Sequence, residues 1–177
     1  MAWNVPLTFA SNSVLDATSL NLMLRDNMNE TAPAKASKTG TYFASSATNT
    51  ITEYQPLTAV ADGNLSVTST TYVSGYGPSL TFRCGGQFLV MWSVRLKAST
   101  GIASCCPATS VSGTVQEAAA DYLAVRNEGN SQYRMRLSSC HLYVSHPANT
   151  LIKVDLQYRT SGTTAAFGQR SLIVLPL

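Results

Sequence analysis

The strongest constraint on the fold of this chain is an alternation of apolar and polar side chains that recurs from about residue 66 onward. The clearest stretch has five apolar side chains at every second position, Phe88, Val90, Trp92, Val94 and Leu96. Successive side chains of a β-strand point to opposite faces of the sheet, so these five share one face. The pattern predicts a β-strand with that face buried.

The same alternation returns near the end of the sequence. Ile152, Val154, Leu156 and Tyr158 alternate with charged or amide side chains, which predicts a half-buried antiparallel strand. The last predicted strand, residues 165–177, closes with six apolar residues in a row. A strand with two apolar faces is central in its sheet or lies at a subunit interface. For the interface, the residues assigned to an oligomer contact are Leu172, Val174, Leu175 and Leu177.

Weaker signals fill the region between these strands. Strands are predicted near 66–73, 80–82 and 121–126, with turns at 85–86 and 127–130 and a loop at 99–113. The apolar side chains change parity between Leu137 and Leu142, which predicts a β-bulge near Ser138-Ser139. Seven or eight short strands with no helical pattern after residue 30 predict an all-β, antiparallel sandwich or jelly roll over residues 66–177.

Residues 1–35 form a different kind of segment. Asp16 can cap a helix predicted for residues 17–30, on which Leu20, Leu24 and Met28 form a narrow apolar stripe, and Pro33 ends it. A helix of this length is marginal alone and must dock on something. Docking on its own domain and docking on another subunit are both open. The polar connector at residues 36–65 separates the helix from the β domain and favours another subunit.

Composition and charge argue against several classes of protein. Charged residues make up 12% of the chain, about half of the roughly 25% that is usual. The net charge of +3 comes with no block of basic residues, which argues against a nucleic-acid-binding protein. Residues 1–13 lack the pattern of a secretory signal, and no apolar run approaches the ~18 residues of a membrane span. We therefore expect no membrane insertion.

The sequence offers no convincing catalytic or metal-binding constellation. Four cysteines, Cys84, Cys105, Cys106 and Cys140, lack zinc-site spacing and are expected to be free thiols, although a Cys84–Cys140 disulfide stays open. Neither His141 nor His146 has a nucleophile and an acid at a motif spacing. Two carboxylates such as Asp121 and Asp155 could serve a glycosidase, and we keep this as a remote alternative. The expectation is a non-enzymatic protein without a cofactor.

Sequence patterns at both ends resemble one group of proteins. The opening carries Trp3 and Pro6, then Leu24-Arg25-Asp26-Asn27 and Pro33-Ala34-Lys35, and the close is Gln169-Arg170-Ser171 followed by residues 172–177. Together these resemble virion structural proteins of actinobacteriophages, of the minor tail or surface type. The resemblance implies a trimeric jelly roll of the complement and tumour-necrosis-factor type. It also implies an N-terminal segment that anchors the protein to the particle. The anchoring residues are then Trp3, Pro6, Phe9, Leu20, Leu24, Arg25 and Met28.

The expected function is a tail-associated or fibre-type virion protein whose β domain faces the host surface. Exposed loops at 99–113 and 126–132 would carry any recognition, with a host cell-surface glycan as the ligand considered. The expected partners are further copies of the chain in a homotrimer, and the tail or major capsid protein. The alternative is a capsid decoration protein or head fibre that stabilises the shell.

Overall fold

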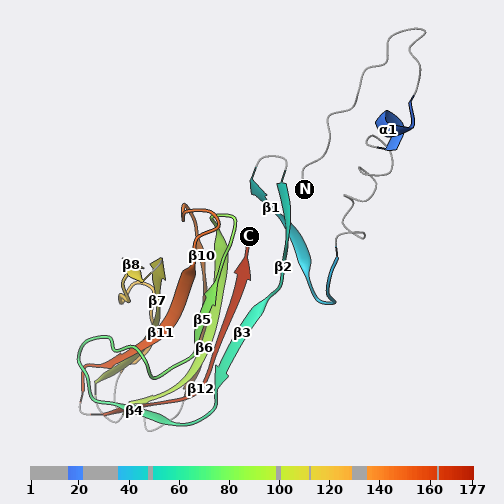
Figure 1. Cartoon of the computed structure of the whole chain (residues 1–177). Coiled ribbons are helices and arrows are strands. Elements are labelled where there is room, and N and C mark those ends of the chain that lie inside the picture. The colour runs from blue at the N-terminus through green and yellow to red at the C-terminus, as the bar shows by residue number, and fades with distance from the viewer. Residues whose placement is uncertain are drawn as a thin grey trace. The chain divides into compact units, whose positions relative to one another are not determined.

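A computed structural model describes residues 16–21, 36–47, 50–98, 101–111, 113–128, 135–162 and 164–177. The chain divides into two units, Met1–Gln55 and Pro56–Leu177, and each is described by itself (Figure 1). Of the predicted helix, the described part is the short helix α1 (Ala17–Leu20). The other predicted anchoring residues lie outside the described residues, and nothing is described of the Leu20 side chain. These residues are Trp3, Pro6, Phe9, Leu24, Arg25 and Met28.

The first unit contains an antiparallel hairpin of β1 (Tyr42–Ala47) and β2 (Thr50–Tyr54). The carboxylate of Glu53 accepts hydrogen bonds from the Ser37 amide at 2.9 Å and from the Ser37 and Thr41 hydroxyls at 2.6 Å each. These bonds lower the pKa of Glu53 to about 2. None of the described hairpin side chains is fully buried. The hairpin therefore has hydrogen bonds but no core of its own.

The second unit is built entirely from antiparallel strands in its described part. Sheet I has the order β10-β6-β12-β3, with β4 also paired to β12, and sheet II has the order β5-β11-β7-β8, with β9 also paired to β7. Strands β3 to β7 are Leu57–Ala61, Leu65–Val67, Ser79–Phe82, Phe88–Ala98 and Ile102–Val111. Strands β8 to β12 are Thr114–Glu117, Val125–Glu128, Met135–Tyr143, Ile152–Thr160 and Ala165–Pro176. The all-β, antiparallel prediction is confirmed.

The pairing of these strands is nested, which means that the earliest strands in the chain pair with the last and the intermediate strands pair with each other. The first strands, β3 and β4, pair with the last, β12, while β5 pairs with β11, β6 with β10, and β7 with β9. A further pairing of β12 with β6 completes sheet I, and a pairing of β11 with β7 completes sheet II.

The core lies between the two sheets. It includes the inward side chains of the two strands that the alternation predicted best, β6 and β11, and also those of β12 and β7. The large apolar side chains with no exposed surface are Phe88, Val90, Val94, Leu96, Ile152, Val154, Leu156, Tyr158, Phe167, Leu172 and Val174. The periodicity of the sequence therefore identified the buried faces of β6 and β11 correctly.

The β domain begins earlier than residue 66. Strand β3 pairs with β12 through the register Leu172↔Ala59 and Val174↔Leu57, so part of the predicted connector belongs to sheet I. Leu57 packs against the core, whereas Val60 on the opposite face is 64% exposed. The hairpin of the first unit also lies within the predicted connector, which therefore contains β1 and β2 of the first unit and β3 of the second.

The predicted loop at 99–113 is wrong. Residues 102–111 form β7, an interior strand of sheet II in which Ala103 to Thr109 are all buried. Its small side chains hide the apolar alternation that marks other strands. One edge of β7 pairs with β9 at Ile102–Cys105 and with β8 at Thr109–Val111, which leaves a gap between them. Pro107, which has no N–H to donate, lies in that gap.

Two further local predictions are corrected. Strand β10 pairs with β6 without a register shift from Met135 to Tyr143, so Ser138-Ser139 is not a bulge. The irregularity lies in β12 instead, between Gly168 and Ser171. Asp121 is in a turn and not in a strand, and Asn127, predicted to start a turn, lies in β9.

Strand β12 is central in sheet I, between β6 on one side and β3 and β4 on the other. Leu172 and Val174, assigned from the sequence to an oligomer contact, are core residues of their own domain with no exposed surface. Their inward orientation follows from the alternation, because Leu175 lies on the opposite face and is partly exposed. Leu177 is 36% exposed. Of the four residues predicted for an oligomer contact, Leu175 and Leu177 have exposed surface.

Candidate functional site

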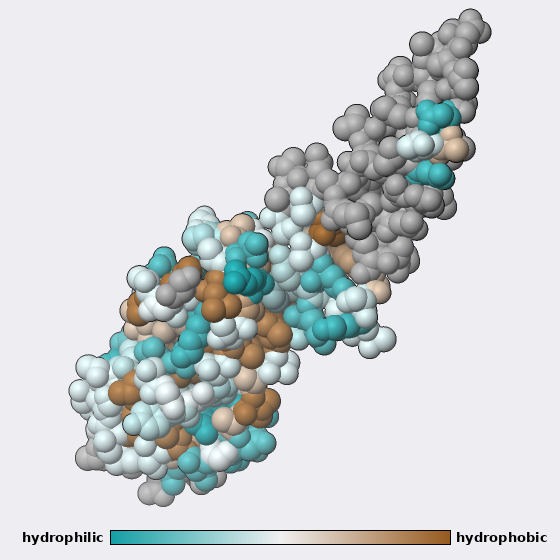
Figure 2. Space-filling view, viewed as in Figure 1, coloured by the Kyte–Doolittle hydropathy of each residue, from teal (hydrophilic) through white to brown (hydrophobic). Residues whose placement is uncertain are grey.

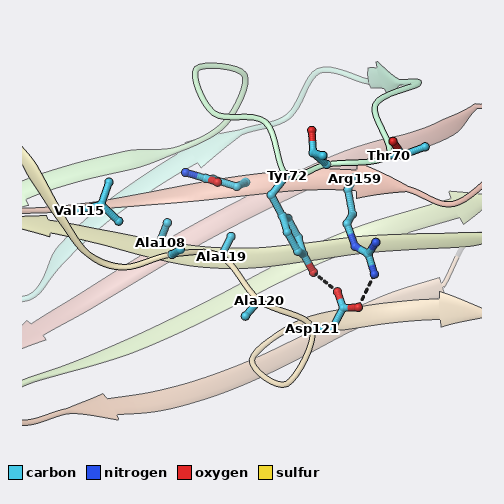
Figure 3. Close-up of a pocket in the computed structure, with 11 residues that line it drawn as sticks. Thr70, Tyr72, Ala108, Val115, Ala119, Ala120, Asp121 and Arg159 are labelled. Atoms are coloured by element: carbon cyan, nitrogen blue, oxygen red, sulfur yellow. Dashed lines mark hydrogen bonds and ion pairs between the residues drawn. The ribbon is translucent and has the colours of Figure 1, made fainter.

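A shallow depression of about 570 Å³ lies on the outer face of sheet II. Strands β7 and β11 form its floor, and two loop segments, 70–72 and 118–121, rise on its sides (Figure 3). The lining residues are Thr70, Thr71, Tyr72, Ala108, Val115, Ala118, Ala119, Ala120, Asp121, Gln157 and Arg159. The site thus combines a floor of small apolar side chains with polar groups from three separate parts of the chain.

Three side chains converge at one end of this depression. The hydroxyl of Tyr72 donates a hydrogen bond of 2.9 Å to Oδ1 of Asp121, and Nη2 of Arg159 forms an ion pair with Oδ2. The Arg159 guanidinium lies 5.3 Å from the centre of the Tyr72 ring. Figure 3 shows Tyr72 and Arg159 extending side by side toward the Asp121 carboxylate. We call Tyr72, Asp121 and Arg159 the polar triad.

Local backbone contacts place each member of the triad. Val73 exchanges two hydrogen bonds with Tyr158, at 2.9 and 3.2 Å, which fixes Tyr72 beside β11. Arg159 follows directly in β11 and points to the outer face because Tyr158 points inward. The Asp121 carbonyl accepts a hydrogen bond from the Ala124 amide at 3.2 Å, which holds the turn that carries the carboxylate.

The contacts within the triad favour an ionised Asp121 and a protonated Tyr72. The hydrogen bond from Tyr72, followed by the contacts with Arg159, lowers the pKa of Asp121. Burial, together with the hydrogen bond to Asp121, raises the pKa of Tyr72, so its hydroxyl stays protonated at neutral pH. The Asp121 side chain is 46% exposed and that of Arg159 22%. The result is an ionised, partly exposed carboxylate in a rigid setting, which can accept hydrogen bonds from a ligand.

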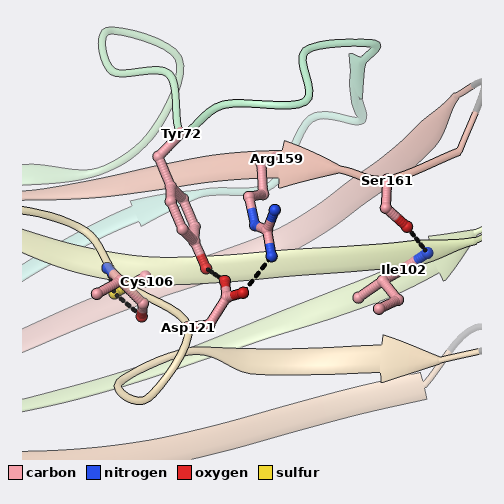
Figure 4. A network of polar contacts seen from close by, with 7 residues as sticks. Tyr72, Ile102, Cys106, Asp121, Arg159 and Ser161 are labelled. Atoms are coloured by element: carbon pink, nitrogen blue, oxygen red, sulfur yellow. Dashed lines mark hydrogen bonds and ion pairs between the residues drawn. The ribbon is translucent and has the colours of Figure 1, made fainter.

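Cys106 lies beneath the same loop. Its Sγ is 3.4 Å from the Ala120 nitrogen and 3.3 Å from the Ala120 oxygen. Figure 4 shows Cys106 near the triad. Burial raises the pKa of this thiol to about 11, so it is protonated at neutral pH. A protonated, buried thiol is a poor nucleophile. Cys106 therefore serves to seat the loop on β7.

The other predicted chemical groups do not join this site. Asp155 is buried, and that burial raises its pKa, whereas Asp121 is held by Tyr72 and Arg159. His146 packs 5.0 Å from the Phe88 ring and His141 lies 4.5 Å from the Tyr143 ring. These distances place both histidines in an aromatic group at β6 and β10.

The thiols, the metal-binding side chains and the helices give no further candidate site among the described residues. All four cysteines are free, with Cys140 exposed and the other three buried, so the Cys84–Cys140 pairing does not form. Among the described residues, no group of three or more His, Cys, Asp or Glu side chains could hold a metal ion. No helix in the described part of the chain is long and apolar enough to cross a membrane.

A second surface of interest is the outer face of sheet I. The register aligns Leu142 with Leu89 and Leu175 in one cross-strand row, and Met91 with Ile173 in the next. These five side chains form what we call the apolar band. All of them are partly or largely exposed, with Leu142 at 48%. In Figure 2, brown hydrophobic patches are visible on this domain.

The recognition loops expected from the sequence are also revised. The 99–113 segment is mostly the buried strand β7, and of residues 126–132 the described part is in β9. The exposed segments that border the depression are instead 70–72 and 118–121. Neither Tyr72 nor Arg159 was predicted from the sequence as a functional residue. Comparison with protein-family models gives no match for this chain, and comparison with curated proteins gives none either.

Proposed function

We propose that this chain is a non-enzymatic structural protein of a phage particle, tail-associated or of the fibre type. Its N-terminal unit would anchor it to the particle, and a trimeric jelly-roll domain would face the host. The observation that carries the proposal is the nested strand pairing of β3 and β4 with β12, β5 with β11, β6 with β10 and β7 with β9. Such nesting is what a rolled-up antiparallel ribbon, the jelly roll, requires, and the sequence resemblance at both ends implies that fold.

The anchoring role is supported by the hairpin of the first unit. An isolated two-stranded hairpin is at best marginally stable in water, and none of the described side chains of this hairpin is fully buried. A unit of this kind gains stability when another surface covers it. In the proposal, that surface belongs to a tail protein, and Trp3, Pro6, Phe9, Leu20, Leu24, Arg25 and Met28 contribute apolar and basic contacts.

Self-association is supported by the apolar band. Five apolar side chains on adjacent strands, Leu89, Met91, Leu142, Ile173 and Leu175, would leave water when a second copy covers them. Leu177 lies at the end of the same strand as Leu175 and extends this surface. The number of copies, three, comes from the resemblance.

Host contact is assigned to the depression on sheet II. Its ionised carboxylate, guanidinium and amide, together with two threonine hydroxyls, offer both acceptors and donors to a polyhydroxylated ligand. One aromatic side chain, Tyr72, stands at its edge and could contact the apolar face of a sugar ring. A host cell-surface glycan fits this combination.

The experiment that tests the proposal is particle incorporation. Phage that carries a deletion of residues 1–55 of this chain is propagated, and purified particles are probed with an antibody to the β domain. We expect the truncated domain in the lysate but not on particles, because the anchor is lost. A matched control deletes residues 129–132 of the β domain and should incorporate normally. Normal incorporation of the 1–55 deletion, or absence of the full chain from particles, would overturn the proposal.

The location of the protein on the particle is determined with the same preparations. Labelled antibody on the tail, with few copies per particle by quantitative mass spectrometry, is the expected result. Label spread over the head in many copies would instead assign the chain to the alternative role, a decoration protein or head fibre that stabilises the shell.

A further inference from the structure

Three cationic side chains share the outer face of sheet I. Arg136 on β10 lies directly opposite Arg95 on β6, and Lys97 follows two residues later on the same face of β6. Like charges directly opposite each other on neighbouring strands destabilise a sheet.

The part of the protein that the structure describes does not neutralise these charges. Within the described residues, none of the three cations forms an ion pair with an acidic side chain. Nε of Arg95 is buried without a hydrogen-bond partner, and this side chain lies beside Gly168, about 3.7 Å from where a Cβ on that residue would be. Arg136 donates a 3.3 Å hydrogen bond to the Ser93 hydroxyl.

A row of hydroxyl groups lies next to the cations. Ser138, Ser93 and Ser171 are aligned across β10, β6 and β12, and the hydroxyls of Ser93 and Ser171 are 2.8 Å apart. All three line an open depression of about 500 Å³ on this face. The three cations do not line this depression, but the Arg136 guanidinium reaches its edge through the bond to Ser93. Guanidinium and hydroxyl donors at such neighbouring positions match the several acceptor oxygens of a phosphate, sulfate or carboxylate group.

The cations lie on the same face as the apolar band. Arg95 is four residues from Met91 along β6, about 13 Å at ~3.3 Å per residue. A standard protein interface covers about 800 Å² on each partner and is therefore roughly 30 Å across. A second copy centred on the apolar band would then have Arg95 and Arg136 at its rim, with Lys97 just beyond. Like charges that are brought together at an interface oppose association.

We propose that the Arg95–Lys97–Arg136 cluster binds an oxyanion of the size of phosphate, and that this binding is coupled to self-association through sheet I. The coupling rests on the self-association advanced under the proposed function, whereas the binding site stands on the cluster alone. The bound anion neutralises the cluster, and the copies then approach each other. Without the anion, mutual repulsion of the clusters opposes the contact.

The test measures self-association of the full chain by sedimentation velocity, with and without inorganic phosphate at matched ionic strength. Phosphate is expected to lower the dissociation constant of the oligomer about tenfold or more, as linkage to a ligand of the assembled state requires. Arg136→Gln, on the edge strand, should associate without phosphate and lose most of its phosphate response. Lys153→Gln removes one exposed cation from sheet II and serves as the matched control. It should respond like the unmodified chain.

The outcomes separate the two proposals. Stable oligomers whose dissociation constant is the same with phosphate, without it and in Arg136→Gln would overturn the anion coupling and leave self-association intact. A monomer at every protein and phosphate concentration would overturn both self-association and the coupling. An equal phosphate effect in Arg136→Gln, Lys153→Gln and the unmodified chain would reflect the general stabilisation by excluded salts and would also overturn the site.

Discussion

At the scale of single residues, the most demanding contact is between Gly77 and Tyr158. Tyr158 is fully buried, and its ring lies where a side chain at position 77 would be. A Cβ added to Gly77 would be 2.7 Å from Cε2 of Tyr158 and closer still to the hydroxyl. Glycine is therefore required at this position by the tyrosine and not by an unusual backbone angle.

This contact yields a prediction for stability. Gly77→Ala should lower the free energy of unfolding by about 1–3 kcal/mol, the range for an overpacked core. The same change in a Tyr158→Phe background should cost less, because the nearest overlapping atom is gone. Urea denaturation of the two single variants and the double variant measures the coupling between them. Additive effects of the two substitutions would contradict this account.

The polar triad makes a prediction about protonation. The hydrogen bond from Tyr72 is the largest cause of the lowered pKa of Asp121. Tyr72→Phe should therefore raise that pKa toward its ordinary value of about 3.9, as read from the carboxyl carbon in an NMR titration. Asp155→Asn is a control that leaves the triad in place. An unchanged Asp121 titration in Tyr72→Phe would show that the hydrogen bond does not form.

The lowered pKa of Asp121 determines how its contribution to the free energy of unfolding depends on pH. Because the folded-state pKa of Asp121 is lowered, its contribution is present above the unfolded-state pKa of about 3.9 and is lost as pH falls through the folded-state value. The carboxylate is 46% exposed, so the contribution is modest, within the range of about 0–1 kcal/mol for solvent-screened pairs.

At the scale of elements, the sequence predicts a strand well where one face is apolar and the other polar. Strands β6 and β11 meet this condition, and their inward residues are buried as expected. Strand β7 does not, because the loop at 118–121 covers part of its outer face and its side chains are small on both faces. The alternation is absent because of tertiary packing. Ala120, in the loop that covers β7, is 14 residues from Cys106 in the sequence.

The misplaced bulge has a similar cause. The parity change after Leu137 reflects apolar side chains on the exposed face of β10, where Leu142 is 48% exposed, with no slip in register. The real irregularity, at Gly168–Ser171 in β12, leaves Arg170 buried, with its guanidinium bound to the carbonyls of Tyr76 and Gly63. A buried arginine satisfied by distant carbonyls has no local sequence signature.

Substitutions of Leu172 and Leu142 distinguish the buried face of sheet I from its exposed face. Leu172→Ala should destabilise the domain by about 2–5 kcal/mol, because it opens a cavity between the sheets. Leu142→Ser should leave the unfolding of dilute protein nearly unchanged and weaken self-association. Thermal unfolding at low concentration and sedimentation at high concentration measure the two effects. A large loss of stability in Leu142→Ser would place that side chain in the core.

At the scale of the whole molecule, the candidate site depends on contacts that local sequence does not reveal. Tyr72 and Asp121 are 49 residues apart, and Arg159 follows 38 residues after Asp121. Each is an ordinary residue in its own segment, and the site exists because β11 lies beside both loops. The class of fold was predictable from periodicity, whereas the site required the topology.

The central position of β12 has a consequence for how the chain is made. This strand comes after every other strand of its domain, yet it joins β6 to β3 and β4 within sheet I. While the ribosome is still producing residues 165–176, one edge of β6 and the matching edges of β3 and β4 have no partner. Exposed strand edges invite aggregation, and non-local pairing is slow. Sheet I therefore closes only after β12 has emerged, and a nascent chain paused before that point exposes strand edges of β6, β3 and β4.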